Sequence, residues 1–111
     1  MTNTPDYEQF GRHFLDRQPL SPNCRQILVD GLAAAEAGAD IERMTRRDQG
    51  HDWIRILGRD VGSLYDPSGD SVVSLMRLMG FELVERVEKN HYRLTEKGKA
   101  VARMILRSPA A

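Results

Sequence analysis

Cysteine is nearly absent from this sequence: Cys24 is the single one among 111 residues. A disulfide within the chain and a metal cluster built on cysteines are therefore both excluded. The three histidines, His13, His51 and His91, fall in separate segments without the close spacing of zinc ligands. Paired-carboxylate motifs, glycine-rich phosphate loops and nucleophile elbows are also lacking. We therefore expect a protein that is not an enzyme and that holds no metal and no cofactor.

Long apolar runs are lacking too. No segment approaches the length that crosses a bilayer, and the start Met1–Asp6 has neither the basic end nor the apolar centre of a signal peptide. We therefore expect a cytoplasmic protein without a membrane partner. The apolar content of 41% and the charged content of 29% are ordinary for a globular protein, and 111 residues suffice for one domain but not for two.

Net charge is absent as well, because 16 Lys and Arg balance 16 Asp and Glu. The balance hides an asymmetry between the two parts of the chain. Residues 1–70 hold 8 Lys and Arg against 12 Asp and Glu, whereas residues 71–111 hold 8 against 4. A basic C-terminal part is consistent with a polyanionic partner, and it is equally consistent with ordinary segregation of charge on a solvated surface.

The N-terminal part predicts two helices. The first is expected over 4–17, where Tyr7, Phe10 and Phe14 fall at helical spacing on one face. These aromatic side chains are either core contacts or a face for a second copy or another partner. The second helix is expected to begin after Ser21, which can cap it, and to end at Gly38.

Residues 40–70 predict two more helices and a loop. A short helix is expected over 40–47 and a longer one over 52–61, since apolar side chains recur there at helical spacing. The short helix would carry a basic group made of Arg43, Arg46 and Arg47. Turn-forming residues are dense over 62–70, which indicates a loop.

The stretch 71–98 is the most informative part of the sequence. Residues 71–79 predict a helix with Ser74 and Arg77 facing outward and an inner apolar face made of Val72, Leu75, Met76 and Met79. Two extended runs, 81–87 and 91–94, flank a polar turn and predict a β-hairpin. A last helix is expected to begin after Thr95.

This order of elements resembles a known family. The segment Trp53–Gly62 is similar to the first helix of a helix-turn-helix, and Ser71–Phe81 looks like a recognition helix that leads into a wing. The ending Tyr92–Gly98, with the sequence Tyr-Arg-Leu-Thr-Glu-Lys-Gly, resembles the close of the wing in many bacterial repressors, including multiple-antibiotic-resistance-type regulators. The resemblance covers residues 53–98. It implies a mainly α winged helix-turn-helix with a small two-stranded antiparallel β-wing.

The resemblance also implies a division of the chain, a partner and a set of contacts. It predicts an N-terminal helix or arm over 1–20, a winged helix domain over 21–107 and a disordered tail over 108–111. Such proteins are usually dimers that bind duplex DNA, and a small transcriptional regulator is the function expected first. The recognition helix would offer Ser71, Ser74 and Arg77 to the major groove. The wing would offer Arg86, Lys89, Asn90, His91 and Arg93 to the backbone.

Two alternatives stay open. The recognition helix carries one cation and follows a long connection over 62–70, which favours a protein-interaction module that does not read DNA, such as an adaptor or an inhibitor of a nucleic-acid-handling complex. The aromatic stripe of Tyr7, Phe10 and Phe14 would then be its partner or dimer face. A repressor that senses a small molecule is the third hypothesis. Its pocket would be lined by Met44, Trp53, Met76 and Met79.

Overall fold

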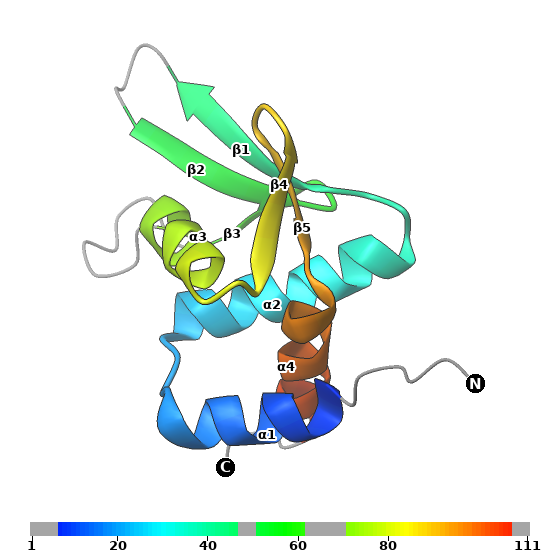
Figure 1. Ribbon diagram of the computed structural model, residues 1–111. Coiled ribbons are helices and arrows are strands. Elements are labelled where there is room, and N and C mark those ends of the chain that lie inside the picture. Colours follow the sequence, from blue (N-terminus) through cyan, green and yellow to red (C-terminus); the bar gives the residue numbers. More distant parts are fainter. Residues whose placement is uncertain (1–6, 47–50, 62–70, 108–111) are drawn as a thin grey trace.

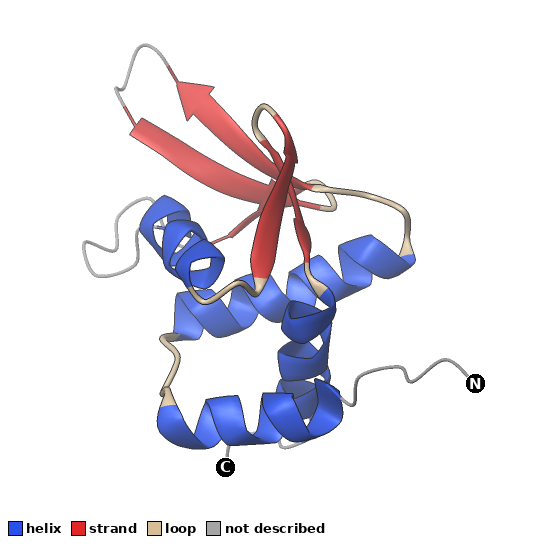
Figure 2. Ribbon diagram, viewed as in Figure 1, coloured by secondary structure: helices blue, strands red, loops and turns tan. Residues whose placement is uncertain are grey.

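In the computed structural model, the described residues are 7–46, 51–61 and 71–107. This part of the chain forms one five-stranded antiparallel sheet with four helices gathered on one side of it (Figure 1). Figure 2 shows the same arrangement by element type, with the strands together at one end of the molecule and the helices below them. The helices are α1 (Tyr7–Arg17), α2 (Pro22–Glu36), α3 (Ser71–Gly80) and α4 (Glu96–Arg107). The strands are β1 (Ile41–Arg46), β2 (His51–Ile56), β3 (Arg59–Val61), β4 (Val84–Glu88) and β5 (His91–Leu94).

The expected fold class, a mainly α winged helix-turn-helix with a two-stranded wing, is wrong. The hairpin expected after α3 is present as β4 and β5, but these are two strands of a five-stranded sheet with the order β3-β2-β1-β5-β4. The two helices expected over 40–47 and 52–61 are absent, because those residues form β1, β2 and β3. The chain therefore has an α+β fold.

Strand pairing explains why these segments are not helices. Ile54 and Ile56 are buried, while the residues between and before them are half-buried, so the burial alternates with a period of two. A short apolar segment fits both the helical and the strand period, and β-branched isoleucines favour the strand. Pairing of β1 with β2 runs in one register from Ile41↔Ile56 to Arg46↔His51.

The turn between β2 and β3 also excludes a helix. Leu57 and Gly58 have φ values of 52° and 77°, in the left-handed region that a right-handed helix cannot contain. Two successive residues with positive φ form the tight turn that joins two antiparallel strands. A leucine at such a position was not an evident turn signal, so the sequence pattern over 52–61 suggested an uninterrupted helix.

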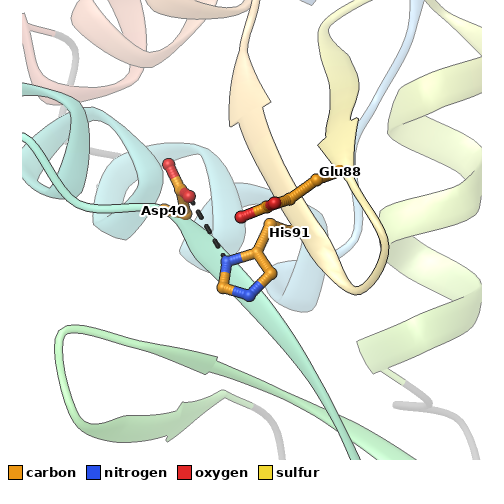
Figure 3. Close-up of side chains that lie close together, drawn as sticks. All are labelled: Asp40, Glu88 and His91. Atoms are coloured by element: carbon orange, nitrogen blue, oxygen red, sulfur yellow. Dashed lines mark ion pairs between the residues drawn. The ribbon is translucent and has the colours of Figure 1, made fainter.

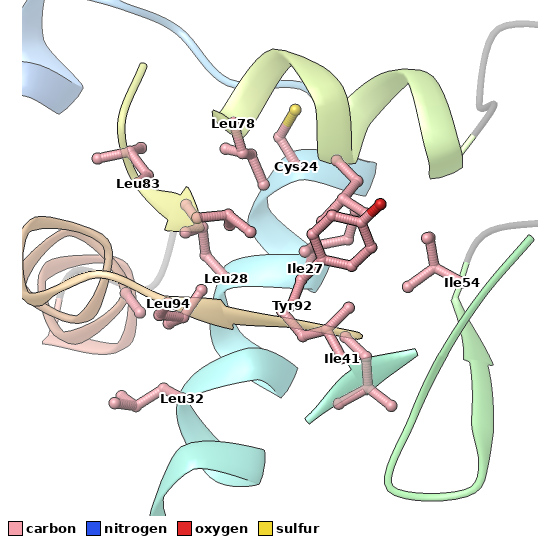
Figure 4. Close-up of a cluster of buried hydrophobic side chains, with 14 of the residues drawn as sticks. Cys24, Ile27, Leu28, Leu32, Ile41, Ile54, Leu78, Leu83, Tyr92 and Leu94 are labelled. Carbon is pink, nitrogen blue, oxygen red and sulfur yellow. The ribbon is translucent and has the colours of Figure 1, made fainter. Parts of the chain in front are cut away.

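The core lies between the sheet and the helices. Buried side chains from α2, α3 and α4 meet the inner face of the sheet, and the sheet contributes Ile41, Ile54, Tyr92 and Leu94 among others (Figure 4). Cys24 belongs to this core, where its thiol lies 3.9 Å from the carbonyl oxygen of Ser74. The residues that connect α3 to β4 also contribute, since Leu83 is fully buried.

The start of α4 is fixed by Thr95. Its hydroxyl accepts the N–H of Gly98 at 3.0 Å and donates to the carbonyl oxygen of Glu82 at 2.6 Å. The backbone N–H of Thr95 donates to the carbonyl oxygen of Leu83 at 3.0 Å. A Cβ at Gly98 would overlap that same carbonyl group, so the absence of a side chain allows α4 to approach the α3–β4 connection. These contacts set the position of α4 relative to the hairpin.

Several expectations fall outside the described residues, namely the loop over 62–70 and the tail over 108–111. Within the described ranges, no helix is long and apolar enough to cross a membrane.

Candidate functional site

The helix α3 does not present the side chains expected of a recognition helix. Ser71 is 5% exposed and Ser74 is 9% exposed, so both serines are buried rather than outward-facing. The hydroxyl of Ser71 accepts the backbone N–H of Ile54 at 3.3 Å, which ties the start of α3 to β2. The predicted outer face of this helix is therefore wrong, because Ser71 contacts β2 and Ser74 lies beside Cys24 of α2. Arg77 is exposed, as expected.

The face of α3 that does meet solvent is mostly apolar. Val73 is 54% exposed and Met76 is 38% exposed, and both are among the large apolar side chains most open to solvent. Arg77 and Gly80 continue the same stripe, since residues three and four apart lie on one side of a helix. Met76 was expected to point inward, and this expectation is also wrong. We call Val73, Met76, Arg77 and Gly80 the α3 face.

A small hollow adjoins the α3 face at Arg77. It has a volume of about 210 Å³ and lies where the α1–α2 connection meets the end of α3. Its lining mixes apolar and polar side chains: Gln18, Pro19, Leu20, Ser21, Cys24, Arg77 and Phe81. Sites for cofactors and other small molecules usually measure about 300–1,000 Å³. The hollow is therefore better matched to one side chain of a partner than to a cofactor.

The β4–β5 hairpin exposes two cations, Arg86 on β4 and Lys89 in the turn. Lys89 and Asn90 form the turn between β4 and β5, and Asn90 has a φ of 64°, which asparagine tolerates in tight turns. The carbonyl oxygen of Asn90 accepts the backbone N–H of Arg43 at 2.9 Å, which fastens the turn to β1. Lys89 and Arg86 are exposed and have no carboxylate partner among the described residues. These two side chains are the wing cations that remain available for a ligand.

The other two basic groups expected on the wing face a carboxylate. Arg93 donates through Nε to Oδ1 of Asp40 at 2.6 Å, and Nδ1 of His91 lies 3.3 Å from Oδ2 of the same carboxylate. The hydrogen bond from Arg93 is the main reason that the pKa of Asp40 lies below its usual value, although partial burial opposes this. Asp40 thus joins the segment before β1 to β5.

Glu88 completes a cluster around His91. It is the register partner of His91 across the hairpin, and its side chain extends toward Asp40, so that both carboxylates lie beside the imidazole (Figure 3). One ligand-type atom from each of Asp40, Glu88 and His91 lies within 4.8 Å of the others. The sequence separates these residues by up to 51 positions, so spacing along the chain gave no sign of the cluster.

Ion pairs between distant segments bring basic residues of the C-terminal part together with acidic residues of the N-terminal part. Arg107 at the end of α4 pairs with Glu8 of α1 at 2.6 Å, and Arg93 pairs with Asp40. In both pairs the cation comes from residues 71–111 and the anion from residues 1–70. Within the C-terminal part, Lys97 and Lys99 also have carboxylate partners. Four of the eight cations in residues 71–111 therefore have a carboxylate partner in the described structure.

The basic group expected on a short helix is also dispersed. Arg43 pairs with Asp52 at 2.6 Å across β1 and β2, and its hydrogen bond to Asp52 is the main reason that its pKa lies above the usual value. Arg46 is the last residue of β1, which is a strand and not the expected helix. Arg47 lies outside the described residues. The three arginines therefore do not share one helical face.

The aromatic stripe of α1 packs within the chain. The ring of Phe14 lies 5.2 Å from that of Phe81 and 5.9 Å from that of Phe10, measured between ring centres. Both rings are partly buried against the core, and Nζ of Lys97 lies 5.4 Å above Phe10. Tyr7 is half-buried at the start of α1. The expected partner face is thus largely occupied by intramolecular contacts, and a homodimer stays a prediction.

The side chains proposed to line a small-molecule pocket do not converge. Met44 and Trp53 are cross-strand partners on the side of the sheet opposite the buried isoleucines. The indole N–H of Trp53 donates to Asp60 at 2.9 Å, and Arg55 pairs with the same carboxylate. Met76 is exposed on α3, whereas Met79 packs against the core.

Comparison of the chain with known protein families, with curated proteins and with solved structures gave no match. The functional conclusion therefore depends on the residues described above.

Proposed function

We propose that this protein is a protein-interaction module that docks through the α3 face. The observation that carries the proposal is which face of α3 meets solvent. The two serines suited to base contacts are buried, while Val73 and Met76 are exposed. Exposed apolar side chains grouped on one helix are typical of protein contacts, and they offer no hydrogen bonds to base edges.

The chemistry of the α3 face indicates the kind of partner. Apolar side chains of the partner would cover Val73 and Met76, and a partner carboxylate would meet Arg77, which is exposed and forms no ion pair with another described residue. The hollow beside Arg77 could take one further side chain. Buried apolar anchors next to a charged contact are the usual source of affinity in such interfaces.

The test is capture of a partner from a nuclease-treated cell extract. We expect the native protein to retain the partner and Met76→Glu to lose it, with affinity lowered by about tenfold or more, since a buried carboxylate replaces an apolar anchor. Leu106→Glu is the matched control, because Leu106 is 56% exposed on α4, away from α3. Equal capture by Met76→Glu and the native protein would contradict the proposal.

Duplex DNA is the second candidate partner, and the availability of Arg86 and Lys89 at the hairpin favours it. Binding through phosphates would weaken with added salt, by about 0.9 log unit per log unit of salt for each phosphate neutralised. A titration of labelled duplex DNA with Lys89→Gln and Arg86→Gln separates the two candidates. Salt-sensitive binding that these substitutions abolish, together with loss of capture after nuclease treatment, would support DNA over protein.

A further inference from the structure

The cluster of Asp40, Glu88 and His91 has the composition and geometry of a metal site. We propose that these three side chains bind one divalent transition-metal ion, with Zn²⁺ as the ion to test. The proposal does not depend on docking by the α3 face, which involves none of these residues. It also reverses the expectation that the scattered histidines bind no metal.

The imidazole of His91 gives the first line of support. Its Nδ1 atom is inaccessible to solvent and makes no hydrogen bond of acceptable geometry in the described structure. The contact of 3.3 Å with Asp40 is close enough for an ion pair but is misdirected for a hydrogen bond. A buried polar atom without a hydrogen bond calls for an explanation, and a bound ion is one of the usual ones. Figure 3 shows Nδ1 directed toward the Asp40 carboxylate.

Asp40 is already arranged as a ligand. Arg93 holds Oδ1 at 2.6 Å, which fixes the carboxylate and leaves Oδ2 facing His91. Carboxylates that bind metals are commonly oriented by a hydrogen bond to their second oxygen.

Local charge favours a cation. Asp40 and Glu88 supply two negative charges, and Glu42 adds a third on the same face because it is the cross-strand partner of His91. Arg93 offsets one of them. The remaining excess is negative, and a divalent ion would neutralise it.

The backbone positions the ligands with little freedom. Glu88 and His91 flank the two-residue turn, and the contact between Arg43 and Asn90 fastens that turn beside β1. Zinc bonds to nitrogen and oxygen of about 2.0–2.2 Å place tetrahedral ligands roughly 3.4 Å apart. The present separations of up to 4.8 Å need a small contraction, which rotation of the exposed Glu88 side chain can supply. Water would fill the fourth position.

Imidazole nitrogen with two carboxylates suits zinc and similar first-row ions rather than Mg²⁺ or Ca²⁺, which prefer all-oxygen sites. A bound ion would connect the β4–β5 hairpin to the segment before β1. It would therefore strengthen the junction between the two parts of the sheet.

The test is a calorimetric titration of chelator-treated protein with zinc chloride. We expect one Zn²⁺ per chain, and we expect His91→Gln and Glu88→Gln each to weaken binding by about tenfold or more. Matched controls are His13→Gln, which changes an exposed histidine of α1, and Glu85→Gln, which changes an exposed carboxylate of β4. Both controls should bind zinc as the native protein does.

A second measurement identifies the ligand atom. In nitrogen-15 spectra of the imidazoles, zinc should shift Nδ1 of His91 while leaving His13 unchanged. Absence of binding heat and of a shift in excess zinc would overturn the proposal. Binding that survives in the His91→Gln, Glu88→Gln double variant would overturn it equally, as would a spectrum in which His91 stays protonated in an ion pair with Asp40.

Discussion

Single residues of α3 change the functional interpretation of the whole protein. Ser71 and Ser74 are both buried, and their burial leaves Val73 and Met76 on the solvent side. The hydroxyl of Ser71 has a structural partner, the N–H of Ile54, whereas the hydroxyl of Ser74 has none among the described residues. A serine in a helix is therefore no reliable sign of an exposed position, since its hydroxyl can accept a hydrogen bond from a buried backbone N–H.

The difference between these serines gives a prediction at the residue scale. Ser71→Ala should lower the free energy of unfolding by about 1–3 kcal/mol, because the buried N–H of Ile54 loses its acceptor. Ser74→Ala is the matched control and should be close to neutral, since no described residue forms a hydrogen bond with its hydroxyl. Urea unfolding of both variants measures the difference. Equal stability of the two variants would show that the contact with Ile54 contributes nothing.

At the scale of elements, the connection from α3 through the hairpin to α4 was predictable, and the segment before it was not. Turn residues and alternating apolar residues marked β4 and β5, and Thr95 marked the start of α4. Over 40–61, the same apolar residues fit a helix and a strand equally well. Pairing with β5 decided the matter, because Ile41 and Glu42 align with Tyr92 and His91, which lie about 50 positions later.

Thr95 carries the prediction at this scale. Thr95→Ala removes the cap of α4 and the hydrogen bond to Glu82, so we expect the free energy of unfolding to fall by about 1–2 kcal/mol. Thr95→Ser keeps the hydroxyl and should retain most of the stability. Thermal unfolding followed by circular dichroism compares the two. A midpoint for Thr95→Ala equal to that of the native protein would exclude a capping role.

At the scale of the whole molecule, the sheet consists of two parts joined at a narrow junction. β1, β2 and β3 form one part and β4 and β5 the other, and two residue pairs of β1 and β5 connect them. Ile41 lies at this junction, fully buried and aligned with both Ile56 and Tyr92. The proposed zinc site lies beside the same junction, on the opposite face of the sheet.

We therefore predict that Ile41 determines the cooperativity of the fold. Ile41→Ala should lower the free energy of unfolding by about 2–5 kcal/mol, and Ile41→Val by about 0.5–1.5 kcal/mol. Urea transitions followed by Trp53 fluorescence, which reports β2, and by circular dichroism, which reports the helices, should coincide in the native protein. Separate transitions in the native protein would indicate that the two parts unfold independently.

The sequence by itself determined the features that depend on neighbouring residues: helices α1, α2, α3 and α4, the β4–β5 hairpin, and the lack of a disulfide. Local periodicity, caps and turn residues carry that information. The tertiary structure alone decided which side of α3 meets solvent, that 41–61 forms strands, and that Asp40, Glu88 and His91 come together. Each of these depends on contacts between segments far apart in the chain. An amphipathic pattern predicts that one face of a helix is buried. Which residues lie on that face is decided by the other elements against which the helix packs.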